Sequence, residues 1–221
     1  MSRETQLRLY AHPFSSYCQK ALTALYENAT PFEFRMLDSA EAMAELEALW
    51  PFRKFPVLVD GERPIRETSI IIEYLGVHYR GPMKLLPEDP RASIEVRFMD
   101  RFFDNYIMTP QQKLVFDALR PAEHRDPYGV EEAKRMLEMA YRWLDKTLQG
   151  RQWAAGGAFT LADCAAAPAL FYADWSHAIA DEFANVKAYR QRLLARPSFA
   201  RAVEEARPYR HLFPLGAPDR D

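Results

Sequence analysis

Cysteine is scarce in this chain of 221 residues, which has only Cys18 and Cys164, far apart. Two distant cysteines cannot form the disulfide framework of a small secreted domain. The five histidines show no metal-ligand spacing with cysteines or carboxylates, so the sequence predicts no metal site. These absences favour an intracellular protein that folds around an ordinary hydrophobic core.

A surplus of positive charge is also missing. Lys and Arg total 29 against 31 Asp and Glu, a formal net charge of −2, which gives no electrostatic basis for binding nucleic acid. No apolar run approaches the roughly 18 residues of a membrane span. Residues 1–6 are polar and do not resemble a signal peptide. We therefore expect a cytoplasmic protein with no nucleic-acid partner and no membrane contact.

The first part of the chain mixes strands and helices. Alternating segments predict strands and apolar residues at helical spacing predict helices. Asp60 and Gly61 suit a tight hairpin turn, and Pro64 confines the strand after it to a sheet edge. The expected order is βαβαββα, with strands at 7–10, 32–36, 57–59 and 62–65 and helices at 17–28, 39–49 and 68–79.

The second part is predicted to be entirely helical. Residues 81–90 contain three prolines and indicate a linker, so the predicted domains are 1–80 and 91–221. The clearest helix carries an apolar stripe and stops at Gly150. Pro110 is expected to disturb a long helix. The helices are expected at 91–119, at 129–150, and from Thr160, from about Asp181 and from Pro197.

Residues 14–21 form the turn between the first strand and the first helix. Ser15 and Ser16 are typical helix caps there. A helix N-terminus also offers free N–H groups and a partial positive charge, which favour a thiolate. Capping and catalysis are compatible, and both interpretations stay open. Cys18 lies one turn inside the helix on its apolar face, so we expect it in the core.

Two further helix starts carry polar residues. Thr68 precedes an apolar helical run and is either an N-cap or part of an anion site at the helix N-terminus. Thr160, with Asp163 at the third helical position, predicts a capping box, and Phe159 with Cys164 predicts a hydrophobic staple. The second pattern has a structural role.

Together these motifs resemble the cytosolic glutathione transferase family. Ser15 stands where glutaredoxins have their reactive cysteine, as in the serine-type classes that include theta and zeta. The resemblance continues through Phe-Pro-Val-Leu at 55–58, the hairpin and Glu-Thr at 67–68, and then Thr-Leu-Ala-Asp at 160–163 with Pro168. It spans almost the whole chain and implies an α/β thioredoxin-like N-terminal domain followed by an all-α C-terminal domain.

The resemblance also implies roles for particular residues. The hydroxyl of Ser15 would hydrogen-bond the sulfur of glutathione and act as the catalytic group. A cis bond before Pro56 would turn the backbone of Phe55 toward the cysteinyl part of glutathione, although the family usually has valine or a similar residue at this position and often has asparagine and glycine near Trp50 and Arg53. The implied glutathione-binding residues are Lys54, Phe55, Pro56, Glu67 and Thr68, and the implied second-substrate residues are Phe14, Tyr106 and Trp175.

The implied activity is conjugation of the glutathione thiolate to a small, apolar electrophile, as in detoxification. Glutathione would be the co-substrate, no metal would be needed, and the chain would form a homodimer through its third and fourth helices. Two alternatives stay open. One is a non-catalytic regulatory or interaction protein of the same fold, and the other is a glutathione-dependent isomerase, for which the typical tryptophan and arginine are absent. A cysteine-type oxidoreductase is disfavoured because position 15 is serine.

Overall fold

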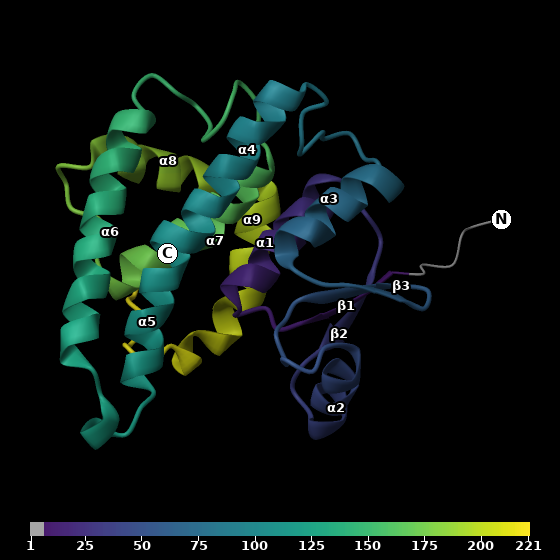
Figure 1. The fold of residues 1–221 in the computed structure, drawn as a ribbon, viewed down its shortest axis with the longest axis horizontal. Coiled ribbons are helices and arrows are strands. Elements are labelled where there is room, and N and C mark those ends of the chain that lie inside the picture. Colours follow the sequence, from purple (N-terminus) through teal and green to yellow (C-terminus); the bar gives the residue numbers. More distant parts are fainter. Residues whose placement is uncertain (1–6) are drawn as a thin grey trace.

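The structure is a computed structural model that describes residues 7–221, so the first six residues of the predicted N-terminal domain lie outside the described residues. Its first half has the expected βαβαββα order and is packed beside a bundle of helices (Figure 1). The elements of this half are β1 (Leu7–Ala11), α1 (Ser16–Glu27), β2 (Glu33–Met36), α2 (Ala40–Leu49), β3 (Val57–Asp60), β4 (Arg63–Ile65) and α3 (Thr68–His78).

The four strands form one mixed sheet in the order β2-β1-β3-β4. β1 is parallel to β2 and antiparallel to β3, and β3 is antiparallel to β4. Gly61 has φ +60 in the turn between β3 and β4, and Pro64 lies in the edge strand β4, so both hairpin predictions are confirmed. This is the thioredoxin-like layout that the sequence predicts.

From Pro90 onward every element of the described chain is a helix. The expected long helix at 91–119 is disturbed near Pro110, as predicted, because six π-helical residues, Phe103–Met108, end two residues before that proline. The elements are α4 (Pro90–Phe102), the π-helix η1 (Phe103–Met108), α5 (Thr109–Ala118), the 3₁₀ turn η2 (Ala122–His124), α6 (Pro127–Thr147), α7 (Leu161–Ser176), α8 (Ala184–Leu194), α9 (Pro197–Ala206) and the 3₁₀ segment η3 (Arg207–Leu212).

Helix α7 is the centre of the bundle, and its residues from Leu161 to Trp175 are all buried. The capping box at its start is present as predicted. The carboxylate of Asp163 accepts hydrogen bonds from the N–H groups of Thr160 at 2.8 Å and Ala154 at 2.9 Å. These bonds fix the start of the helix against the loop before it.

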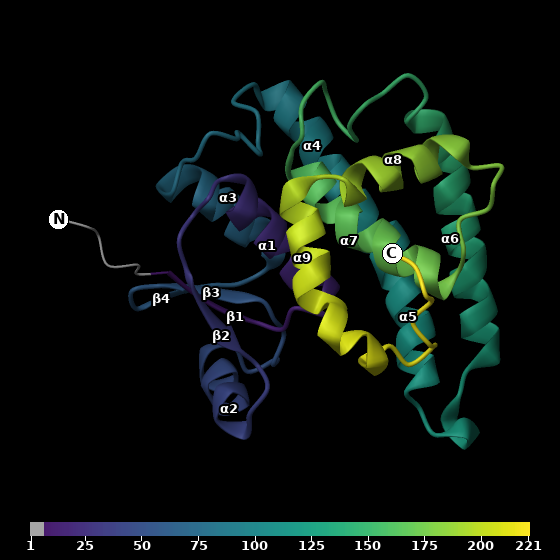
Figure 2. The ribbon, with the colours of Figure 1, turned by 180° about the vertical axis from the view of Figure 1, so that it is seen from behind.

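The two halves meet along α1, which packs against α7 and α9 (Figure 2). At the end of α1, Glu27 pairs with Arg196 at 2.6 Å and also accepts a hydrogen bond from Ser198. Only 6% of the Glu27 side chain is exposed. This pair therefore ties the sheet domain to the segment between α8 and α9.

Candidate functional site

The turn before α1 carries Ser15, which is the N-cap of the helix with φ −86 and ψ 125. Its Oγ accepts a hydrogen bond from the N–H of Cys18 at 3.4 Å. This bond uses a lone pair of the hydroxyl, so the O–H remains free to donate to another group. Ser15 is only half-buried, so capping the helix and stabilising a bound thiolate are compatible at this position.

Cys18 is a core residue, as predicted. Its side chain is fully buried, and burial raises the pKa of its thiol to about 12 despite the hydrogen bond with Ser15. A thiol with this pKa stays protonated at neutral pH and is a poor nucleophile. Tyr17 is next to it in sequence, and burial together with the carboxylates of Asp104 and Glu67 raises its pKa as well. Tyr17 therefore keeps its hydroxyl proton and is a second possible donor near the turn.

The sheet register brings three predicted segments to one end of the sheet. Tyr10 at the end of β1 pairs with Val57 at the start of β3, so the Phe55–Pro56 pair lies beside the turn that leads to Ser15. Leu58 pairs with Ile65 at the end of β4, so the residues after Ile65, which begin α3, emerge at the same end. The order across this edge is the start of α1, the segment before β3 and the start of α3.

The Phe55–Pro56 peptide bond is cis, as the family resemblance implies. Among residues 7–221 no hydrogen bond reaches the backbone N–H or C=O of Phe55, so both groups are available to a ligand. Lys54 is exposed beside them. Arg53 has φ +53, a left-handed conformation that favours glycine, which agrees with the glycine that the family often has near this position.

The start of α3 differs from a capped helix. The N-cap is Glu67, whose side chain accepts no hydrogen bond from the helix, and Thr68 is the first helical residue. The interpretation of Thr68 as the N-cap is therefore wrong. None of the hydrogen bonds among residues 7–221 uses the N–H of Thr68 or of Ser69, and such free donors at a helix N-terminus suit an anion.

Glu67 itself has an unusual backbone. Its φ of +66 is rare for a residue other than glycine, and its exposed side chain has no hydrogen bond or ion pair within residues 7–221. A strained residue with a side chain that stabilises nothing nearby is typical of a functional position.

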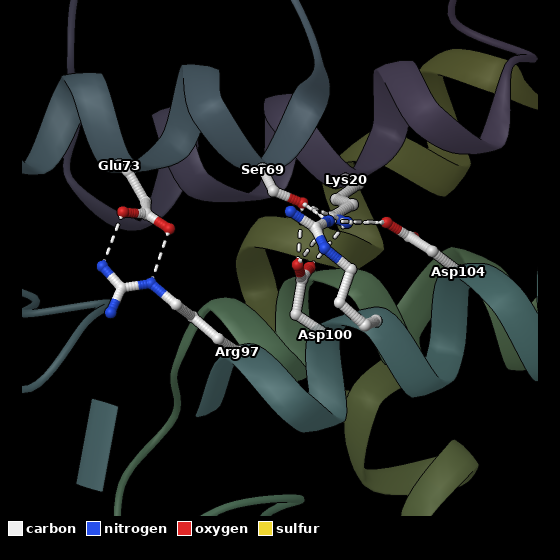
Figure 3. Close-up of polar contacts among 7 residues, drawn as sticks. Lys20, Ser69, Glu73, Arg97, Asp100 and Asp104 are labelled. Carbon is white, nitrogen blue, oxygen red and sulfur yellow. Dashed lines mark hydrogen bonds and ion pairs between the residues drawn. The ribbon is translucent and has the colours of Figure 1, made fainter. Parts of the chain in front are cut away.

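Behind this helix start lies a buried charged cluster that sequence analysis missed. Lys20, in the second turn of α1, contacts Ser69, Asp100 and Asp104 (Figure 3). Burial raises the pKa of Asp104, and the Lys20 ammonium opposes that shift. The only sequence signal was a lysine on the otherwise buried face of α1, at a position flanked by core residues.

The structure brings two of the three predicted second-substrate residues together. The ring of Phe14 lies 6.5 Å from that of Trp175. Tyr106 is in the π-helix η1, where it is 49% exposed and stacks on Phe102 at 5.7 Å. Among the described residues no ring contact joins Tyr106 to Phe14 or Trp175, and its role stays a prediction from the family resemblance.

The segment after α9 covers Trp175, which sequence analysis did not anticipate. The ring of Phe213 lies 5.4 Å from the indole, and the guanidinium of Arg210 lies 4.7 Å from it. Asp221 pairs with Arg210 at 2.9 Å and so holds the end of this segment in place. The cavity left beside Phe14 and Trp175 is about 10 Å³, which is room for about one water molecule.

Other cavities lie away from these residues. A groove of about 670 Å³ runs between α1, β2 and α9 along Tyr26 and Phe32, and none of the predicted site residues lines it. Within residues 7–221 no cluster of three His, Cys, Asp or Glu side chains is arranged to hold a metal ion. None of the helices in that range is long and apolar enough to cross a membrane.

Comparison with known proteins assigns the family. The model for the glutathione S-transferase N-terminal domain matches residues 9–83, and the model for the C-terminal domain of the same family matches residues 107–197. Glutathione S-transferase U7 of Arabidopsis thaliana is 32% identical over 167 residues, which are 75% of this chain and 68% of that protein. The chain therefore belongs to the glutathione S-transferase family.

Two further similarities bear on function. A solved glutathione S-transferase of Methylobacterium radiotolerans, in complex with glutathione sulfonate, is 29% identical with a TM-score of 0.78, over 90% of this chain and 95% of that one. A stringent starvation protein A homolog of Coxiella burnetii is 25% identical over 171 residues, 77% of this chain and 78% of that protein. The chain is therefore similar both to proteins named as transferases and to a protein named as a stringent starvation protein.

Proposed function

We propose that this protein binds glutathione along the end of the sheet and transfers its thiolate to a small electrophile. The observation that carries this proposal is the convergence of the Ser15 hydroxyl, the unpaired backbone of Phe55 and the uncapped start of α3. Each group matches a different part of one tripeptide: its thiol, its central peptide and its γ-glutamyl end.

The start of α3 supplies the γ-glutamyl subsite. The free N–H groups of Thr68 and Ser69 and the positive end of the helix favour a carboxylate. The Thr68 hydroxyl has no hydrogen bond within residues 7–221 and can add a further donor. The carboxylate of Glu67 faces solvent without a partner and suits the ammonium of the same ligand. The backbone of Phe55 would pair with the cysteinyl unit as a short strand does, and Lys54 would attract the glycyl carboxylate.

The chemical step requires an ionised sulfur. A free thiol has a pKa of ~8.5, and lowering it by about two units requires ~2.7 kcal/mol of selective stabilisation. One hydroxyl that donates to a charged acceptor contributes ~1.5–3 kcal/mol, and the helix terminus adds ~0.3–1 kcal/mol. Ser15 at the start of α1 provides both. The thiolate then forms a carbon–sulfur bond while the leaving group departs with the electron pair of the bond that breaks.

A second candidate function is glutathione binding without catalysis. The small cavity beside Trp175 favours it, because it leaves no room for an electrophile until the segment after α9 moves. The two functions differ in turnover and not in glutathione binding.

Calorimetric titration with glutathione, followed by turnover of 1-chloro-2,4-dinitrobenzene, distinguishes these outcomes. We expect both binding and turnover, and we expect Thr68→Val to weaken binding about tenfold or more because it removes a hydrogen bond to a charged group. Thr147→Val, which removes an exposed hydroxyl on α6, is the matched control and should bind normally. Binding without turnover supports the non-catalytic function, and absence of binding contradicts both.

A further inference from the structure

Lys20 is the most deeply buried cation of the described chain that contacts more than one element. Only 1% of its side chain is exposed. Its Nζ lies 2.6 Å from Asp100 Oδ1 and 2.7 Å from Asp104 Oδ2, and it donates a hydrogen bond to Ser69 Oγ at 3.0 Å (Figure 3). The contact with Asp100 Oδ1 is an ion pair that lies outside hydrogen-bond geometry. A buried ammonium with two carboxylates is held firmly, because each charge depends on the others for compensation.

The three partners of Lys20 come from three different elements. Ser69 is in the first turn of α3, Asp100 is in α4 and Asp104 is in the π-helix η1. Ser69 directly follows Thr68, which we place in the glutathione site. Asp104 is two residues before Tyr106, the predicted second-substrate residue on η1. One ammonium therefore contacts the supports of both halves of the site.

The hydroxyl of Ser69 is fully used inside this cluster. It donates to Asp100 Oδ2 at 2.8 Å and accepts from Lys20 and from Arg101, each at 3.0 Å. A hydroxyl has one proton and two lone pairs, so none remains for a ligand. The Ser69 side chain thus holds the start of α3 in place, and of these two residues only Thr68 has a hydroxyl free for glutathione, while the backbone N–H of Ser69 stays available to the ligand.

The π-helix is held at its start by the Lys20–Asp104 ion pair as well as by its buried side chains. Its hydrogen-bond geometry is rarely adopted, and short π segments inside helices are common at functional sites. The ion pair between Asp104 and Lys20 ties the start of η1 to α1, and Thr109 adds one hydrogen bond to the Asp104 carbonyl at 3.0 Å. Loss of the Asp104 charge should therefore loosen η1 while Lys20 keeps its contacts with Asp100 and Ser69.

We propose that Lys20 is a positioning residue that couples the glutathione site and the second-substrate site. Its contact with Ser69 positions the start of α3 for glutathione, and its contact with Asp104 positions η1 for the second substrate. This inference rests on the proposed function, because it assigns supports to the two halves of that site. It predicts that mutation of Ser69 and mutation of Asp104 affect the binding of the two ligands differently.

The test measures two ligands by calorimetry. Glutathione sulfonate reports on the glutathione half alone, and S-(2,4-dinitrophenyl)glutathione reports on both halves. Ser69→Ala should weaken both ligands by the same factor, about three- to tenfold, the scale of one hydrogen bond. Asp104→Asn should weaken the dinitrophenyl conjugate by a similar factor while glutathione sulfonate changes less than about twofold. Lys20→Met should weaken both, and if it fails to fold the two milder variants still carry the test.

Arg97→Gln is the matched control. Arg97 makes a bidentate ion pair with Glu73 (Figure 3). This pair joins α4 to α3, as the Ser69–Asp100 hydrogen bond does, but on the exposed side of the two helices. Neither ligand should bind more than about twofold differently to this variant, because surface pairs contribute little. An equal loss in Arg97→Gln and in Ser69→Ala would mean that general contact between α3 and α4, and not the Lys20 cluster, sets the site.

Hydrogen exchange of residues 103–108 gives a readout that needs no ligand. Exchange should be faster in Asp104→Asn and in Lys20→Met than in the wild type, and unchanged in Ser69→Ala. Unchanged exchange in Asp104→Asn would overturn the inference even if both ligands bind. Failure of the wild type to bind either ligand would overturn the proposed function, and the coupling with it, whatever the exchange shows.

Discussion

Replacement of Glu67 by glycine should make the protein more stable and, at the same time, a weaker glutathione binder. Glu67 has φ +66, and a non-glycine residue in a sparsely populated backbone region costs about 1–3 kcal/mol. Glycine removes that cost but adds about 0.5–1 kcal/mol of chain entropy, so the expected gain is about 0–2.5 kcal/mol. The variant keeps the first helical hydrogen bond, from Ile71 N–H to the carbonyl of residue 67 at 2.9 Å.

The affinity for glutathione, in contrast, should decrease. The exposed Glu67 carboxylate makes no contact that stabilises the described fold, so its loss should weaken only the binding of the glutathione ammonium. A hydrogen bond to a charged group contributes about 1.5–3 kcal/mol, which is roughly a 10- to 150-fold change in the dissociation constant. Glu67→Ala should lose the same affinity without the gain in stability, because alanine keeps the strained backbone.

Calorimetric titration with glutathione and thermal unfolding of the wild type and both variants measure these effects. A gain of a few degrees in Tm is expected for Glu67→Gly, since about 2–4 °C corresponds to 1 kcal/mol in a chain of this size. Glutathione affinity within twofold of the wild type in both variants would refute the assigned role. So would a Glu67→Gly variant that is less stable than Glu67→Ala, because it would show that the backbone is not strained.

Three further predictions concern stability and assembly. Burial opposes the charged form of Glu27, but hydrogen bonds from Arg196 and Ser198 outweigh it and hold the pKa of Glu27 below the ordinary 4.5. The stability that this pair contributes is therefore present above pH 4.5 and is lost as the pH falls through the pKa of the folded state. Glu27→Gln should therefore lower stability by about 1.5–3 kcal/mol at pH 7 and flatten Tm against pH in acid; an unchanged pH profile would contradict this. Phe98 is 52% exposed on α4 and should lie in the predicted dimer interface. Light scattering should give about twice 25.6 kDa for the wild type and the monomer mass for Phe98→Glu. Equal masses for the two proteins would contradict the interface. Asp163→Ala should cost about 1–3 kcal/mol for each buried N–H left without an acceptor, measured by chemical denaturation, and a loss below 1 kcal/mol would argue against the capping box as a main support of α7.

The fold was predictable because its signals are local. The hairpin at Gly61, the edge position of Pro64 and the capping box at Thr160 each depend on a few adjacent residues, and all three are confirmed. The family resemblance added the cis bond before Pro56, which no local signal requires. The roles of the site residues stay predictions that the structure makes physically reasonable.

The parts that sequence analysis missed depend on contacts between distant residues. Lys20 meets Asp100 and Asp104 across some 80 positions, and nothing in the spacing of α1 indicates its partners. The contacts that cover Trp175 come from Arg210 and Phe213, at least 35 residues later in the chain. The disturbance near Pro110 was predicted, but its form, a π-helix over the residues before the proline, was not.

The most direct test of the central claim is the pKa of glutathione bound to Ser15→Ala, measured as thiolate absorbance against pH. We expect a higher pKa than in the wild type and a conjugation rate at pH 6.5 that falls roughly ten- to a hundredfold, the scale of a hydrogen bond from a hydroxyl to a charged acceptor. Ser16→Ala is the matched control and should leave both values unchanged. A Ser15→Ala variant that keeps the low thiol pKa and the full rate, and loses only the ~1 kcal/mol of a helix cap, would contradict the assignment and direct attention to Tyr17.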